Sequence, residues 1–191
     1  HNHPDHMCDL IPFLFGSRYR LDPRKKDLQI VAGPGFQEFF NKLMLAFKHW
    51  LKPTEYQLNI FEFDEGVFEF KTLKVEAKKV KHIAMSRAYR FTNNKGKSVA
   101  LSGDTDYCES MIELGKGVDL MILECAWPDE EKTEGHLGPT LAAKLAFEAD
   151  CKKLCLTHFY PPCNLENIRQ TVQKAYKGEL VLASDLMQFE L

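Results

Sequence analysis

The first six residues, His1-Asn2-His3-Pro4-Asp5-His6, place three imidazoles and a carboxylate in one short segment. Imidazole nitrogen and carboxylate oxygen are ligands that zinc and similar metals prefer. Alternation in an extended loop would let His1 and His3 converge on one ion while Asp5 and His6 turn toward a second. The rest of the chain must supply the remaining ligands, so the fold has to bring distant segments to this one.

Three further candidate ligands lie just past expected strands. His82 ends the alternating polar and apolar run at 72–81, Asp104 lies in Ser102-Gly103-Asp104-Thr105, and His158 follows the run at 153–157. In α/β proteins, sites assemble where strands end. A lone histidine is more often a structural residue than a ligand. Together with the amino-terminal segment, however, these three residues predict a metal centre.

These motifs resemble those of the metallo-β-lactamase-fold hydrolases, and among them the ribonuclease Z-like branch. The resemblance covers nearly the whole chain. It also includes a histidine before an aromatic and basic strand (81–90), Leu123-Glu124-Cys125-Ala126 and His136-Leu137-Gly138-Pro139-Thr140. Several such pieces in the right order are far more specific than any one of them.

The resemblance implies two divalent metal ions, with zinc favoured and manganese or iron as substitutes. Carried over by position, it assigns His1, His3 and His82 to one ion, Asp5, His6 and His158 to the other, and Asp104 to both as a bridge. It makes His136 a proton donor or a residue just outside the ligands, with Glu124 as its partner.

Hydrolysis is the reaction that follows. Two adjacent cations, roughly 3.5–4 Å apart in such sites, lower the pKa of a bridging water and supply hydroxide. Asp5 is expected to orient this water as well as to ligate, and His136 to give a proton to the leaving oxygen. We therefore expect a dinuclear metal-dependent hydrolase that acts on a small or medium anionic ester, with a phosphodiester favoured.

Other functions stay open. A transfer-RNA 3′ processing endonuclease of the ribonuclease Z type would carry a long basic arm between the His82 strand and the Asp104 turn, but the interval 83–103 is short. A net charge of −2 gives no broad attraction to nucleic acid, so specific binding of nucleic acid is not expected. Thioester or lactam hydrolysis and a non-catalytic metal-binding module are further alternatives. A di-iron redox protein would need a flavin domain.

The hydrophobic pattern predicts an α/β fold, which the resemblance specifies as a four-layer αββα sandwich. Strands are expected at 28–32, 57–63, 67–71, 72–81, 89–92, 98–102, 120–124, 153–157 and 179–183, and helices at 7–15, 36–51, 107–114, 139–149 and 165–176. The segments 64–66 and 93–96 each predict a β-hairpin turn. We expect residues 1–191 to form a single domain.

The family places a run of antiparallel strands before the metal segment, whereas this chain starts on its first ligand. We therefore expect an amino-terminally incomplete domain that lacks those strands. No apolar run approaches the roughly 20 residues that cross a bilayer, so no membrane association is expected. Six scattered cysteines predict free thiols and a cytoplasmic location. A homodimer is left open.

Overall fold

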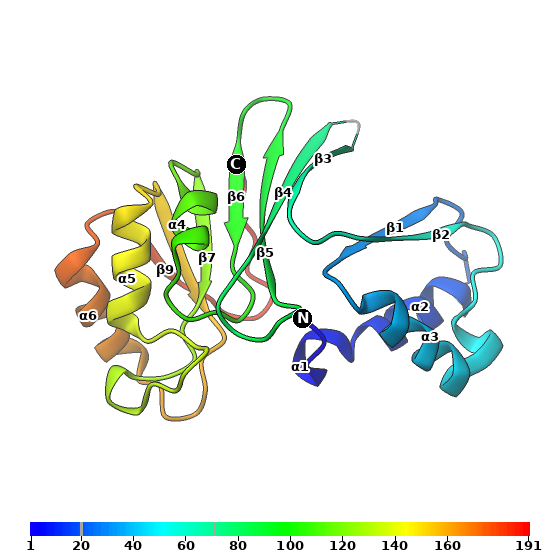
Figure 1. Cartoon of the computed structure of the whole chain (residues 1–191), viewed down its shortest axis with the longest axis horizontal. Helices are drawn as coiled ribbons and strands as arrows, with labels where there is room; N and C mark the ends of the chain where they lie inside the picture. The colour runs from blue at the N-terminus through cyan, green and yellow to red at the C-terminus, as the bar shows by residue number, and fades with distance from the viewer. Residues whose placement is uncertain (20, 71) are drawn as a thin grey trace. The chain divides into compact units, whose positions relative to one another are not determined.

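The computed structural model describes residues 1–19, 21–70 and 72–191 (Figure 1). The chain divides into two compact units, His1–Asp64 and Glu65–Leu191, here called unit 1 and unit 2. Each unit contains a β-sheet and helices that share a core with it, which confirms the expected mixed α/β class. That residues 1–191 form one domain stays a prediction.

Unit 1 contains a two-stranded parallel sheet of β1 (Leu28–Ala32) and β2 (Leu58–Glu62). Its helices are α1 (Pro4–Met7), α2 (Leu10–Tyr19), α3 (Phe36–Phe47) and the short 3-10 helix η1 (Lys48–Leu51). The core centres on Leu14, Phe36, Phe40 and Leu51. Phe36 and Phe40, on the expected helix at 36–51, are thus buried core residues, whereas Phe47 is exposed.

The metal segment in unit 1 differs from the extended loop that we expected. His3 is extended, with φ −66° and ψ 148°, but helix α1 begins at Pro4. Proline suits the first helical position because its φ is already helical and its missing N–H has no partner there. The helix predicted at 7–15 was also wrong in its bounds, since the chain forms α1 and then α2 up to Tyr19.

Unit 2 is built on a seven-stranded sheet in the order β3-β4-β5-β6-β7-β8-β9. The strands are β3 (Gly66–Phe70), β4 (Leu73–Lys79), β5 (Arg87–Asn93), β6 (Ser98–Leu101), β7 (Leu120–Glu124), β8 (Lys153–Thr157) and β9 (Glu179–Leu182). Pairing is antiparallel from β3 to β6 and parallel from β6 to β9. The last residue of the strand predicted at 67–71 lies outside the described residues.

One of the two predicted hairpins is confirmed and the other is wrong. Strands β5 and β6 pair across the turn at 93–96, where Gly96 has φ 79°. The turn at 64–66 does not join a hairpin, because β2 pairs with β1 whereas β3 pairs with β4. A turn sequence predicts that the chain reverses, but it does not identify the strand with which each flank pairs.

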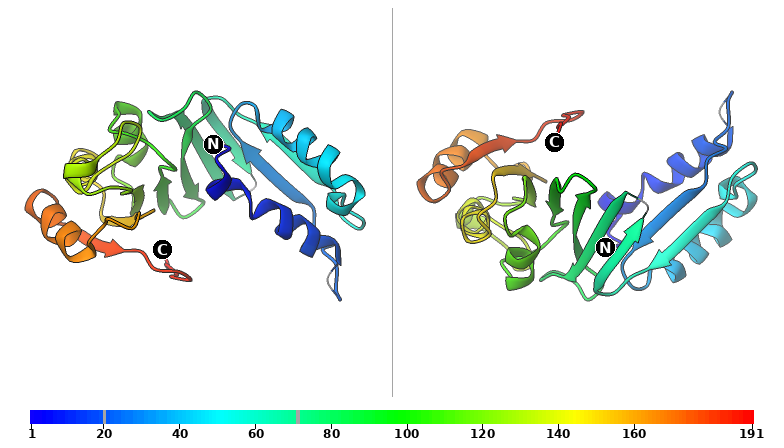
Figure 2. Two further views of the ribbon diagram at one scale, coloured as in Figure 1. Left: turned by 90° about the horizontal axis from the view of Figure 1, so that it is seen from below. Right: turned by 90° about the horizontal axis from the view of Figure 1, so that it is seen from above.

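Helices α4 (Glu109–Gly115), α5 (Pro139–Glu148) and α6 (Leu165–Ala175) share one core with the sheet of unit 2. Helix α4 packs against β4, β5 and β6, α5 against β7, and α6 against β9. Figure 2 shows α5, in yellow, and α6, in orange, on the same side of the sheet in both views. Because β6, β7 and β8 are parallel, their carboxyl ends lie at one edge, and residues that follow them are brought together.

Searched over the described residues, the helices include none with both the length and the apolar character of a membrane span. The six cysteines, all within the described ranges, are free thiols, as predicted.

Candidate metal centre

The edge of the unit 2 sheet carries the candidate site. Asp104 follows β6, Glu124 is the last residue of β7, and His158 comes directly after β8. His82 follows the end of β4. The carboxylates are deeply placed, since Asp104 and Glu124 are each 2% exposed. Burying a carboxylate is costly unless it is paired, hydrogen-bonded or bound to a metal, so both acids require strong partners.

Asp104 lies between two histidines. Its Oδ2 atom is 3.9 Å from Nε2 of His82, and its Oδ1 atom is 3.5 Å from Nε2 of His158. Two donor atoms bound to the same tetrahedral zinc would lie about 3.4 Å apart, given bonds of about 2.0–2.2 Å. Each oxygen of one carboxylate therefore faces one imidazole at a separation close to that of ligands sharing an ion.

A backbone carbonyl fixes the orientation of His82. Nδ1 of His82 lies 3.0 Å from the carbonyl oxygen of Gly135. Because a carbonyl only accepts hydrogen bonds, Nδ1 carries the proton, and Nε2 is left with its lone pair on the side of Asp104. Histidines that bind metals are commonly held through their second nitrogen in this way.

His158 has a backbone conformation that side chains rarely adopt. Its φ is +63°, in the left-handed region, and such residues cost of order 1–3 kcal/mol and cluster at functional sites. The preceding residue, Thr157, is still paired with Glu124 in the sheet, and its carbonyl accepts the N–H of Cys125 at 2.9 Å. The chain therefore turns sharply at His158 out of a fixed strand.

Glu124 holds His136. Its Oε1 lies 2.9 Å from Nδ1 of His136, and its two oxygens accept the backbone N–H groups of Thr105 at 3.0 Å and Ala126 at 3.1 Å. The hydrogen bond to Glu124 raises the pKa of His136 above its ordinary value, although burial acts in the opposite direction. An imidazole with a raised pKa stays protonated to higher pH, as a proton donor requires.

Glu124, His136 and His158 also place ligand atoms within 4.8 Å of one another, so they are a further group that could hold an ion. Both oxygens of Glu124 already accept hydrogen bonds from the backbone, however. This arrangement favours the expected role of Glu124 as the partner of His136.

In unit 1 the amino-terminal segment gathers its own donors. The ring of His1 lies 4.4 Å from the ring of His3 and 4.3 Å from that of His6, measured between centroids. Nε2 of His6 lies 3.3 Å from Oδ2 of Asp5. Four of the seven expected ligands are thus in unit 1 and three in unit 2, and their division between two ions stays a prediction.

Sequence reasoning missed a set of residues around the loop at 132–136. Asp106 is buried and accepts hydrogen bonds from Nζ of Lys132 at 2.9 Å and from the N–H of Gly135 at 3.3 Å. Burial alone would raise the pKa of Asp106, but the hydrogen bonds from Lys132, Tyr107 and Gly135 outweigh it and lower the pKa. The sequence offered one signal for these residues, their position beside the motifs at Asp104 and His136.

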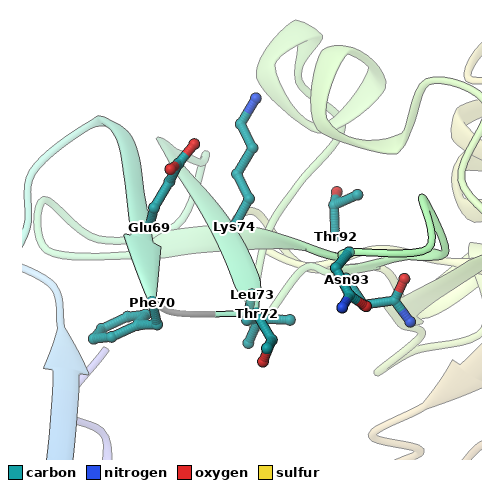
Figure 3. Close-up of a pocket in the computed structure, with 8 residues that line it drawn as sticks. Glu69, Phe70, Thr72, Leu73, Lys74, Thr92 and Asn93 are labelled. Carbon is teal, nitrogen blue, oxygen red and sulfur yellow. The ribbon is translucent and has the colours of Figure 1, made fainter.

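A groove of about 170 Å³ lies at the ends of β3, β4 and β5, but it is separate from this site. Figure 3 shows Glu69 and Lys74 on one side of these strands and Phe70 on the other. Leu73, which lines the groove, begins β4, whereas His82 follows the other end of that strand, about 20 Å away for a strand of this length. None of the described lining residues is a candidate ligand.

The sequence was compared with those of known proteins. A model described as "Beta-lactamase superfamily domain" matches residues 1–159. An uncharacterised protein of Mycobacterium tuberculosis is 29% identical over 184 residues, which cover 93% of this chain and 66% of that protein. Ribonuclease Z of Brevibacillus brevis is 27% identical over 215 residues, covering 84% of this chain and 66% of the relative. The matched region thus spans 66% of the length of these relatives.

A solved structure of the metallo-beta-lactamase fold also matches this chain. The crystal structure of the metallo-beta-lactamase fold protein YhfI from Bacillus subtilis matches with a TM-score of 0.80 and 25% sequence identity. The match covers 96% of this chain and 73% of that one.

Proposed function

The chain belongs to the beta-lactamase superfamily, and from this premise we propose that it is a dinuclear metal-dependent hydrolase. One relative is named ribonuclease Z, and the metallo-β-lactamase fold expected from the motifs is confirmed. In our proposal the ligands are divided between two divalent ions, with zinc favoured. One ion would be held by His1, His3 and His82 and the other by Asp5, His6 and His158, with Asp104 as a ligand shared by both sites.

The arrangement around Asp104 carries the proposal. A bridging carboxylate must present one oxygen to each ion, and here Oδ2 faces His82 while Oδ1 faces His158. The two histidines belong to different ions in the proposed division. The donor set, imidazole nitrogen with carboxylate oxygen, is one that zinc accepts readily.

When bound, two adjacent divalent ions supply water of lowered pKa and stabilise charge on a substrate oxygen. The chain's own residues would donate a proton and orient the attacking water. Glu124 keeps the proton of His136 on Nδ1 and orients the ring, so that Nε2 of a protonated His136 is available to protonate a leaving oxygen. Asp5 is proposed to orient the attacking water as well as to ligate.

For the substrate we propose a small or medium anionic ester, and a phosphodiester in particular. The relative named ribonuclease Z supports phosphodiester chemistry. The size limit rests on the interval 83–103, where β5 and β6 are joined by the tight turn at 93–96 rather than by an extended arm. A net charge of −2 also gives little attraction to a long polyanion.

A second candidate is transfer-RNA 3′ processing, which the same ribonuclease Z relative favours. Thioester or lactam hydrolysis is the third, because a metal pair supports all of these reactions and the walls of the pocket decide among them. In a non-catalytic module we would expect ligands to have been lost, yet all seven expected residues are present.

Elemental analysis combined with a substrate panel tests the proposal. Zinc-loaded protein should hydrolyse bis(p-nitrophenyl) phosphate faster than a chromogenic thioester or lactam, and a chelator should abolish the activity. Fewer than two ions bound at saturating zinc would contradict the dinuclear site. Bound zinc without turnover of any substrate would favour a binding module.

A further inference from the structure

One short loop of unit 2 contacts one residue that the proposed reaction needs and contains another. The loop at 132–136 brings the carbonyl of Gly135 to within 3.0 Å of Nδ1 of His82. The next residue, His136, is the one that Glu124 holds at 2.9 Å. The position of this loop therefore determines the direction of both imidazoles.

Asp106 anchors the loop at two points. Its Oδ2 accepts hydrogen bonds from Nζ of Lys132 at 2.9 Å and from the backbone N–H of Gly135 at 3.3 Å. Asp106 is itself fixed, because its backbone N–H donates to the carbonyl of Lys81 at 2.7 Å and its Oδ1 accepts the N–H of Tyr107 at 2.8 Å. One buried carboxylate thus ties the loop to the segment that leads into His82.

Position 135 requires glycine. Its φ is +86°, in the region that favours glycine. A Cβ atom at this position would lie 2.9 Å from Nδ1 of His82, closer than real Cβ contacts come. Any side chain here would push His82 away from the carbonyl that orients it.

We propose that Asp106, Lys132 and Gly135 form a loop clamp that positions His82 for metal binding and His136 for proton transfer. The inference rests on the proposed function, in which His82 is a ligand of one ion. The clamp residues are positioning residues, because their contacts are to the loop and to His82. Partners of this kind, one step removed from the metal, commonly change metal affinity by about 10- to 100-fold.

The test measures the zinc affinity of each of the two sites separately, by competition with a chromophoric chelator, in the chain of residues 1–191. Asp106→Ala and Gly135→Ala should weaken binding of one ion by about 10- to 100-fold and leave the other nearly unchanged. Turnover at saturating zinc should also fall, because His136 moves with the loop. If the zinc affinity of both sites fell equally, or that of neither site fell, the proposed clamp would be wrong.

Asp119→Asn is the matched control. Asp119 also accepts hydrogen bonds from two lysines, Lys97 and Lys152, and from a backbone N–H, that of Ser98. Lys97 and Ser98 lie at the amino-terminal end of β6, and Lys152 directly precedes β8. The candidate ligands Asp104 and His158 follow the opposite ends of these strands. This variant should keep wild-type zinc affinity and turnover.

Two further variants, Lys132→Met and His82→Ala, test the clamp if Asp106→Ala does not fold and separate it from the ligand assignment. If Asp106→Ala fails to fold, Lys132→Met should still weaken zinc binding at one of the two sites. It replaces a lysine side chain that is 21% exposed by an apolar side chain without an ammonium group. His82→Ala separates the two hypotheses. If it retains both ions, the proposed ligand assignment fails. If it loses one ion while the clamp variants bind zinc normally, the clamp alone fails.

Discussion

Nδ1 of His136 and Oε1 of Glu124 lie 2.9 Å apart, and backbone N–H groups of Thr105 and Ala126 hold the same carboxylate. An ionised carboxylate only accepts hydrogen bonds, so the proton of the imidazole is on Nδ1. Glu124 is therefore bound from three sides, and it fixes both the ring orientation and the tautomer of His136.

Replacing His136 by Ala should lower turnover by about 10² to 10⁴, the usual effect of losing a general acid. Metal content should be nearly unchanged, because His136 is not among the proposed ligands. Substrates with very acidic leaving groups should lose less, since they need no proton. Steady-state kinetics on a series of aryl phosphodiesters, with elemental analysis, would check this. Loss of metal would make His136 a ligand instead.

Asp104→Ala should remove metal from both positions, because one carboxylate serves both ions in the proposed centre. The measurement is metal content after dialysis against a fixed concentration of free zinc. Asp119→Asn is a suitable control, since it removes the negative charge of a unit 2 aspartate whose ion-pair partners are the lysines Lys97 and Lys152. A full complement of two ions in Asp104→Ala would contradict the bridging role.

The left-handed backbone of His158, with φ +63°, predicts a difference between two substitutions. Both His158→Gly and His158→Ala delete the proposed ligand. Glycine adopts this conformation without strain, whereas alanine does not. The metal-free His158→Gly variant should therefore be more stable than the metal-free His158→Ala variant by about 1 kcal/mol. Urea unfolding in the presence of a chelator measures this. Equal free energies of unfolding would show that position 158 carries no such strain.

Asp119 should make stability depend on pH. A hydrogen bond from Lys152, with others from the N–H of Ser98 and from Lys97, lowers the pKa of Asp119 to about 2 despite opposing burial. Because this pKa is below that of the unfolded chain, the stabilisation is present above about pH 4 and is lost as the pH falls toward 2. Asp119→Asn should cost about 1 kcal/mol at pH 7, as expected for a largely surface ion pair.

That cost should shrink toward zero at low pH. The measurement is the free energy of urea unfolding of wild type and Asp119→Asn at several pH values between 7 and 2. A difference that stays constant over this range would rule out the carboxylate charge as its source.

Substrate size gives the last prediction. Binding of a polyanion depends on Lys and Arg displacing counterions from its phosphates, and the short interval 83–103 provides no arm for this purpose. Activity on bis(p-nitrophenyl) phosphate should therefore exceed activity on transfer-RNA precursors, whose binding should be weak and sensitive to salt. Efficient cleavage of a precursor at one site at physiological salt would instead support a ribonuclease Z function.

The sequence predicted best where the local pattern alone decides the structure. Strands β1, β7 and β8 have the predicted bounds, because short apolar runs between turn residues leave little choice. The partner of β3 was not predictable in this way, since pairing with β4 is decided between strands and not within the turn at 64–66.

The candidate site likewise contains one contact that was expected from the sequence and one that was not. The pairing of Glu124 with His136 was expected from the motifs and is confirmed as a hydrogen bond. The contact of Lys132 with Asp106 was not expected, because it joins residues 26 positions apart through a loop with no regular pattern. Such a contact depends on the packed structure, which local propensity does not describe.

The parallel order of β6, β7 and β8 has a consequence for the metal-free protein. Asp104, Glu124 and His158 follow or end strands that are held about 4.8 Å apart by backbone hydrogen bonds. The conformational entropy of bringing these three side chains together is therefore lost when unit 2 folds and not when an ion arrives. The sheet acts as a preorganised template, so metal uptake on this side requires adjustment of side chains without any rearrangement of the strands.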